Sequence, residues 1–185
     1  EMQRSLVGSE MCIRDRFVAL LLAGVMAMVM LTACGGGNGT VIDTTKQKQA
    51  YDTIRSKSSQ VDQASVTEND RELQAIAETY LNQDLNSSID FLGAQWVAGF
   101  HVDGKGTEYL TITATSSYKA GVLVTMMLDT LQTWVGGKEL PDTNVNLNAK
   151  GSWTKLGVVV KTNPTTKQSY MAVTFRIANP AYKGK

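Results

Sequence analysis

The clearest pattern along the chain is the spacing of an amphipathic helix. Apolar residues recur there at intervals of three and four positions: Leu73, Ile76, Ala77, Tyr80 and Leu81. This spacing puts them on one face, so it predicts a helix that starts after the capping residues 67–70 and ends near Leu85. A more polar stretch before it predicts a modest helix over 46–57.

Alternating apolar and polar residues then predict strands on both sides of a very apolar segment. Residues 95–102 and 108–116 predict two strands joined by a turn, with threonines on one face of the second strand. Residues 118–135 leave only a narrow polar strip, which predicts a long helix covered on most sides. Residues 154–161 and 169–178 predict a closing hairpin with one face in the core.

The N-terminal part reads as a leader rather than as part of the fold. Residues 1–16 resemble a translated sequencing adapter and are set aside. Residues 17–33 are an apolar run too short for a membrane-spanning helix, so they predict a signal peptide. The run Leu-Thr-Ala-Cys that ends at Cys34 is similar to a bacterial lipobox. Residues 34–45 therefore predict a lipidated cysteine with a flexible tether, followed by one domain over 46–185.

Composition and charge exclude several classes of function. The net charge is +1, from 18 Lys+Arg against 17 Asp+Glu, so no basic excess is available for binding a nucleic acid. A single histidine excludes a multi-histidine zinc site. Neither cysteine is left for a thiol redox pair, and the chain contains no nucleophile elbow and no phosphate-binding loop motif.

Three stretches between residues 50 and 178 carry a resemblance to a known family. In TIRSKSSQVDQASVTENDRELQAIAETYL, Arg55 ends one helix, and Leu73 and Ala77 fit a helix of the form L-x-x-x-A. The second stretch is the predicted helix that ends at Trp134, and the third is LGVVVKTNPTTKQSYMAVTF. Together with the order of elements, they resemble the CAP superfamily of cysteine-rich secretory, antigen 5 and pathogenesis-related proteins.

The resemblance implies a mixed α/β class, with a CAP-like α/β/α sandwich around an antiparallel sheet. The alternative is a two-layer α+β sandwich of order α-β-β-α-β-β. The two differ in whether the long helix and the early helices lie on opposite faces of the sheet or on one.

The chain also departs from the family where metal-binding members hold their ligands. The family's G-E-N-[IV] strand falls near 106–109, where only Gly106 and Glu108 match. Metal-binding members use two histidines with acidic partners, and no second histidine follows Trp134. The resemblance therefore implies a degenerate domain in which the full set of four ligands cannot be built.

Candidate chemistry centres on the only imidazole, that of His101. With Asp103 and Glu108 in the same predicted hairpin, it can form a weak divalent-metal site or an acid/base pair. The plainer interpretation is a structural histidine beside a solvated turn. Of the three tryptophans, Trp153 follows a Lys-Gly-Ser turn, so it is predicted to be exposed and able to contact a ligand.

The sequence as a whole predicts a bacterial cell-envelope lipoprotein, held on the outer side of a membrane by lipidated Cys34. Its domain is expected to be a non-catalytic binding or scaffolding module for an envelope component, without a resident cofactor. The alternative is a hydrolase, metal-assisted or acid/base, that uses His101 and Glu108.

Overall fold

The arrangement of helices and strands comes from a computed structural model that describes residues 39–91, 94–118, 140 and 145–184. The chain divides into two units, Glu1–Gly36 and Gly37–Lys185. All of the described residues belong to the second unit, which is built around an antiparallel sheet.

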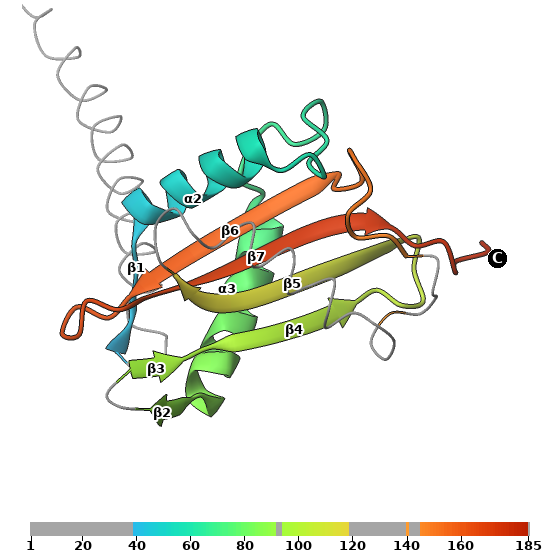
Figure 1. Cartoon of the computed structure of the whole chain (residues 1–185). Coiled ribbons are helices and arrows are strands. Elements are labelled where there is room, and N and C mark those ends of the chain that lie inside the picture. Colours follow the sequence, from blue (N-terminus) through green and yellow to red (C-terminus); the bar gives the residue numbers. More distant parts are fainter. Residues whose placement is uncertain (1–38, 92–93, 119–139, 141–144, 185) are drawn as a thin grey trace, which may run out of the picture. The chain divides into compact units, whose positions relative to one another are not determined.

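The described sheet has five strands in the order β1-β6-β7-β5-β4, and every neighbouring pair is antiparallel (Figure 1). Their bounds are Val41–Ile42 (β1), Lys155–Thr162 (β6), Ser169–Ala178 (β7), Tyr109–Tyr118 (β5) and Ala98–Asp103 (β4). A separate hairpin pairs β2 (Ile89–Phe91) with β3 (Ala94–Trp96). The strand predicted over 95–102 is thus divided at Val97, whereas the closing hairpin lies where the sequence places it.

The two faces of the sheet differ in chemistry, as the alternation in β5 predicts. Leu110, Ile112 and Ala114 join the larger apolar cluster with side chains of β6 and β7. The threonines between and beside them in β5 are buried on the opposite face. Strand β5 therefore presents a polar but buried surface on one side and an apolar one on the other.

Strand β7 differs from the expectation of a hairpin with one face in the core. Along β7, Met171, Val173 and Phe175 belong to the larger apolar cluster, whereas Ala172 packs with the second cluster on the other face. All four are buried. The reason is that α3 packs against one face of β7, while the larger apolar cluster packs against the other.

Two described helices follow β1 in sequence, and both lie where the sequence predicts a helix. They are α2 (Thr44–Lys57) and α3 (Arg71–Ser87). Asp43 caps α2 by accepting a hydrogen bond from the Lys46 N–H, and this bond lowers the pKa of the Asp43 carboxyl. Asp70 caps α3 in the same way, accepting from the Leu73 N–H.

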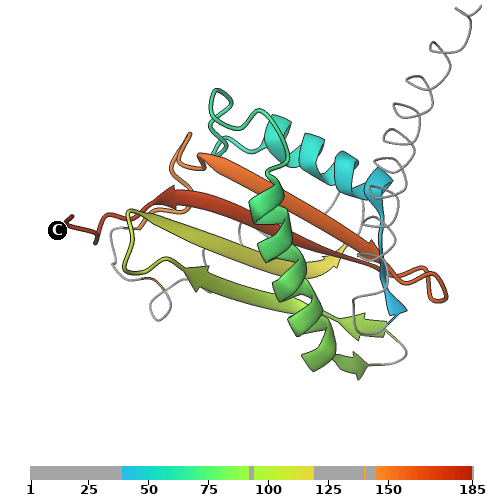
Figure 2. The same ribbon diagram turned by 180° about the vertical axis from the view of Figure 1, so that it is seen from behind.

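Helix α3 crosses one face of the sheet from β6 to β4 (Figures 1 and 2). Of its predicted apolar stripe, Leu73, Ala77 and Leu81 are fully buried, whereas Ile76 and Tyr80 are partly exposed. Leu85, at the end of the helix, is buried as well. At the crossing with β6, Gly157 has no side chain, and a Cβ there would lie only 2.5 Å from the Leu73 Cβ. The helix therefore rests on the backbone of β6 at that point.

Helix α2 runs beside β6, and its buried residues Ala50, Tyr51 and Ile54 belong to the larger apolar cluster. That cluster lies on the sheet face opposite α3, since alternate residues of β6 separate the two clusters. Helix α2 thus packs along β6 at one side of the sheet, whereas α3 crosses a face of the sheet (Figures 1 and 2).

These elements confirm a mixed α/β domain with an antiparallel sheet, consistent with a two-layer α+β sandwich. Strand β5 continues through Tyr118, where the long helix is predicted to begin. The rest of that predicted helix, whose position would distinguish a CAP-like sandwich from the two-layer alternative, lies outside the described residues.

The ordered domain starts earlier than the predicted boundary at residue 46. Thr40 is buried, and Val41 and Ile42 pair with Thr162 and Lys161 of β6. Part of the stretch assigned to a flexible tether is therefore an edge strand of the sheet. The adapter-like segment, the signal peptide and Cys34 lie outside the described residues.

Candidate functional site

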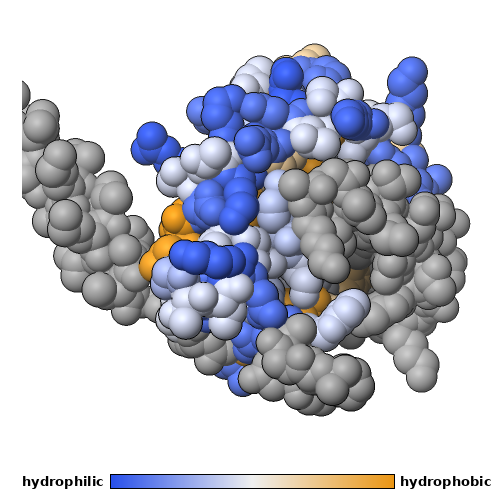
Figure 3. Space-filling view, turned by 60° about the vertical axis from the view of Figure 1, so that its left-hand side comes forward, coloured by the Kyte–Doolittle hydropathy of each residue, from blue (hydrophilic) through white to orange (hydrophobic). Residues whose placement is uncertain are grey.

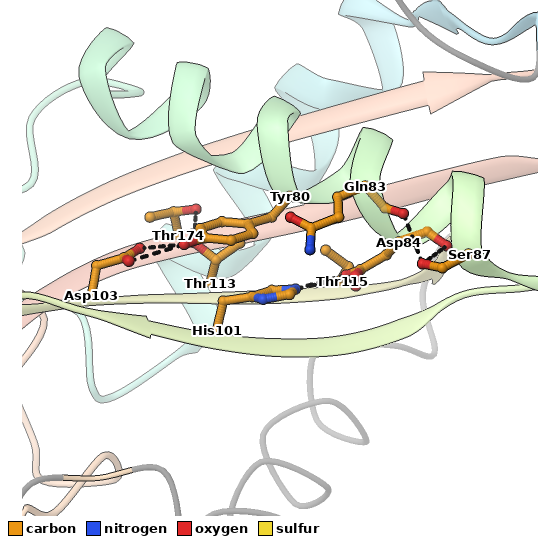
Figure 4. A network of polar contacts seen from close by, with 9 residues as sticks. All are labelled: Tyr80, Gln83, Asp84, Ser87, His101, Asp103, Thr113, Thr115 and Thr174. Atoms are coloured by element: carbon orange, nitrogen blue, oxygen red, sulfur yellow. Dashed lines mark hydrogen bonds and ion pairs between the residues drawn. The ribbon is translucent and has the colours of Figure 1, made fainter.

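The site builds on the polar face of β4, where His101 and Asp103 are two residues apart and so point the same way. Opposite them in β5 lie Thr113 and Thr111. Helix α3 crosses this face and presents Tyr80 and Asp84, one turn apart, toward the same strands (Figure 4). Helix and strands together bring these six polar side chains into one seam.

His101 is held on two sides by α3. Its Nε2 lies 3.0 Å from Oδ2 and 3.2 Å from Oδ1 of Asp84. Its ring stacks on the Tyr80 ring, with centroids 4.0 Å apart and planes 12° from parallel. The His101 and Asp84 side chains are only 20% and 14% exposed, so the pair is partly withdrawn from water.

The hydrogen bonds of this cluster assign the protons. An ionised carboxylate only accepts hydrogen bonds, so the Nε2 of His101 carries the hydrogen that faces Asp84. Thr115 also donates to Asp84, at 2.5 Å. The Tyr80 hydroxyl donates to both oxygens of Asp103 at 2.9 Å. Burial of the phenol raises the pKa of Tyr80, and the Asp103 carboxylate raises it further.

Gly99 makes room for the Asp84 carboxylate. A Cβ at position 99 would lie 2.0 Å from Oδ2 of Asp84 and 2.7 Å from Oγ1 of Thr115. Any side chain there would therefore displace the acceptor that His101 and Thr115 share. The site therefore requires glycine at position 99 of β4.

The structure places the predicted partners of His101 differently from the expectation. Glu108 is exposed in the turn before β5, and no hydrogen bond or ion pair joins it to His101 in the described contacts. Asp103 belongs to the seam, but it accepts a hydrogen bond from Tyr80 rather than from the imidazole. The carboxylate that contacts His101 belongs to Asp84, which sequence reasoning missed.

A signal for Asp84 and Tyr80 does exist in the sequence. They are four residues apart, and the apolar spacing alone places Tyr80 in the apolar stripe of its helix. The threonines of β5 indicate a sheet face that needs hydrogen-bond partners from above. Together, these two patterns indicate a helix that carries polar groups toward the sheet.

The prediction that Trp153 is exposed is wrong. Its side chain is 1% exposed, stacks on Phe175 with ring centroids 3.8 Å apart, and donates from Nε1 to the Leu147 carbonyl at 2.9 Å. The cause is a backbone pairing with the loop after α2, in which Trp153 bridges Val61. Trp153 is therefore a core residue. Trp96 is the exposed tryptophan of the described residues, at 69%, and Trp134 lies outside them.

Two lysines outside the seam also make polar contacts between a helix and the sheet. Lys161 is 1% exposed under α3, and its Nζ donates to Asn82 at 2.8 Å and to Glu78 at 3.3 Å. Lys46 donates to Ser169 at 3.0 Å and pairs with Asp43 at 3.0 Å. Both contacts fasten helices to the sheet.

Among the described residues, no group of three or more His, Cys, Asp or Glu side chains is arranged to hold a metal ion. The seam offers one imidazole and one carboxylate in contact, where most protein metal sites use at least three donors. In the same part of the chain, no helix is both long and apolar enough to cross a membrane. Chemically, the seam supplies an oriented imidazole but no hydroxyl or thiol bonded to it.

The contact between His101 and Asp84 can be tested because the chain has one histidine. Asp84→Asn is expected to shift the imidazole ¹⁵Nε2 resonance and to lower the free energy of unfolding by about 1–3 kcal/mol, since it weakens a charge-assisted bond. Glu108→Gln is the matched control, and both measurements are expected to stay at their wild-type values. If the ¹⁵Nε2 resonance shifted in Glu108→Gln and not in Asp84→Asn, the predicted pairing of His101 with Glu108 would be favoured instead.

Comparisons with protein-family models, with curated proteins and with solved structures found no match for this chain.

Proposed function

We propose that this chain is a bacterial lipoprotein, anchored through Cys34 on the outer side of a membrane, whose domain is a non-catalytic binding or scaffolding module for a cell-envelope component. The observation that supports a non-catalytic domain is that both contacts of the His101 ring are structural. Its Nε2 hydrogen is committed to Asp84 and its ring is covered by Tyr80. The imidazole thus fastens α3 to the edge strand β4.

The anchoring part is supported by how closely the domain follows Cys34. Only the five residues 35–39 separate that cysteine from Thr40, which is already buried. A short glycine-rich connection of this kind joins a lipid anchor to a folded domain without needing a spanning helix.

A hydrolase remains the alternative function, and a weak divalent cation its alternative cofactor. Both would rely on His101, now with Asp84 rather than Glu108 as the neighbouring carboxylate. The Asp84 contact favours an oriented base, because the Nδ1 lone pair is then left for a substrate. What the pair lacks among the described contacts is a nucleophile, since Thr115 donates its own hydrogen to Asp84.

Anchoring is tested by growing bacteria that express the chain with an alkyne-labelled fatty acid. The wild-type protein is expected to carry the label and to sediment with membranes, whereas Cys34→Ala is expected to lose the label. A labelled Cys34→Ala protein would contradict the assignment of the lipidated residue.

The non-catalytic part is tested by thermal unfolding with zinc chloride or with a chelator. The midpoint temperature is expected to be the same in both, because a ligand stabilises a fold only in proportion to its occupancy of a native site. A zinc-dependent rise that disappears in His101→Gln would contradict the proposal and favour the hydrolase.

A further inference from the structure

Three segments that are far apart in sequence meet at one end of the domain, which we call the tether end. They are β1, the turn 163–168 between β6 and β7, and β3 (Figures 1 and 2). Val41 pairs with Thr162, the residue that precedes the turn. The Gln95 N–H lies 3.5 Å from Oε1 of Gln168, at the end of the turn. The tether end is therefore a defined surface of the folded domain.

The tether end is also where the chain from Cys34 enters the fold. The six peptide steps from Cys34 to Thr40 reach at most about 20 Å when fully extended. Thr40 itself is fixed, being 3% exposed and followed directly by β1. An acyl chain on Cys34 would therefore keep this end of the domain close to the bilayer surface.

The side chains exposed at the tether end are suited to a lipid surface. Trp96 is 69% exposed and Val41 is 39% exposed, while 164–167 form an exposed turn that ends in Lys167. Tryptophan favours the boundary between acyl chains and water, and an ammonium group is attracted to anionic lipids. Of the carboxylates at this end, that of Asp43 is already paired with Lys46, so it adds little repulsion, and Asp90 lies opposite Gln95 in the β2–β3 hairpin.

Figure 3 turns this side of the domain toward the viewer and shows small apolar areas set among hydrophilic side chains. Such a mixed surface is too polar to insert deeply, but it can rest in the headgroup region. A single exposed tryptophan would hold the domain there only weakly. Because a tether of this length already confines the domain to the surface, even a weak contact is populated.

We infer that the tether end rests on the phospholipid surface of the membrane that holds the anchor, with Trp96 in the headgroup region. This inference relies on the lipid anchor proposed above. It fixes the orientation of the domain, because β4 and β5 run away from the tether end to the turn 104–108. That turn, with Glu108, then faces away from the membrane and toward envelope partners.

The test uses the lipidated full chain in vesicles of phosphatidylcholine containing one quarter phosphatidylglycerol and a headgroup spin label. A fluorophore is attached to Thr165→Cys at the tether end or, as the matched control, to Gly106→Cys at the opposite end, where a Cβ meets nothing within 4 Å. The label at 165 is expected to lose at least half of its fluorescence. The label at 106 is expected to keep nearly all of it.

A second pair of variants separates contact from simple tethering. Trp96→Ser is expected to reduce the quenching at 165 at least twofold, whereas Tyr182→Ser, which removes an aromatic ring that is 42% exposed, is expected to leave it unchanged. If the protein binds vesicles, two results would overturn the inference. One is equal quenching of the labels at 165 and 106, and the other is quenching at 165 that is unchanged in Trp96→Ser. Protein that does not bind vesicles, and behaves like Cys34→Ala, would overturn the anchor and the inference together.

Discussion

Gly157→Ala is expected to destabilise the domain by at least about 3 kcal/mol, at the upper end of what overpacking normally costs. The added Cβ would lie 2.5 Å from the Cβ of Leu73, 2.6 Å from its carbonyl carbon and 2.7 Å from the Gln74 nitrogen. Two of these three atoms are backbone, so no side chain can rotate away. The whole of α3 would have to lift from β6, and its buried stripe would lose contact with the sheet.

Denaturation by urea, followed by circular dichroism, measures this effect. The matched control is Gly106→Ala, because a Cβ at that position meets no atom within 4 Å. Its free energy of unfolding is expected to stay within about 0.5 kcal/mol of the wild type. If Gly157→Ala behaved like this control, α3 would not approach β6 as closely as described here.

Trp153→Ala is expected to lower the free energy of unfolding by about 3–5 kcal/mol, as large aromatic truncations in a core do. The indole is 1% exposed and stacks on Phe175, with ring planes 9° from parallel. Its removal leaves a cavity in the larger apolar cluster and leaves the Leu147 carbonyl without its donor. Trp153→Phe keeps a stacked ring, so a smaller loss of about 1–2 kcal/mol is expected from the missing hydrogen bond and volume.

Trp96→Ala serves as the comparison within the same protein. The Trp96 side chain is 69% exposed, and its removal is expected to change stability by no more than about 0.5 kcal/mol in the absence of membranes. Equal losses for the two tryptophans in chemical denaturation would contradict the assignment of Trp153 to the core.

Local sequence patterns predict where helices and strands lie, but they predict less well which of their residues are buried. The stripe from Leu73 to Leu81 identified α3, and the alternation in β7 identified its bounds, because both depend only on residue spacing. The same alternation did not predict that Ala172 and Thr174 are buried. Small and hydroxyl-bearing residues are compatible with either water or a covering helix, so only the tertiary arrangement decides.

The site shows the same limit in a sharper form. Sequence proximity suggested Glu108 as the partner of His101, since both belong to one hairpin. The actual partner, Asp84, is 17 residues earlier and on another element. A polar residue on a helix can be assigned to solvent or to the sheet only once the helix orientation is known. The prediction that Trp153 is exposed is wrong for a related reason, because its burial depends on a backbone pairing with Val61, which lies 92 positions earlier in the sequence.

The pairing of β1 with β6 has a consequence for how the chain folds. Val41 at the start of the domain meets Thr162, and α2 packs on the same strand. Neither can find its place until most of the chain is available, and contacts of such long sequence separation slow folding toward the millisecond-to-second range. A chain exported with its N-terminus leading would therefore remain unfolded while it crosses the membrane. Its first strand would be added to the sheet only after β6 had followed it across.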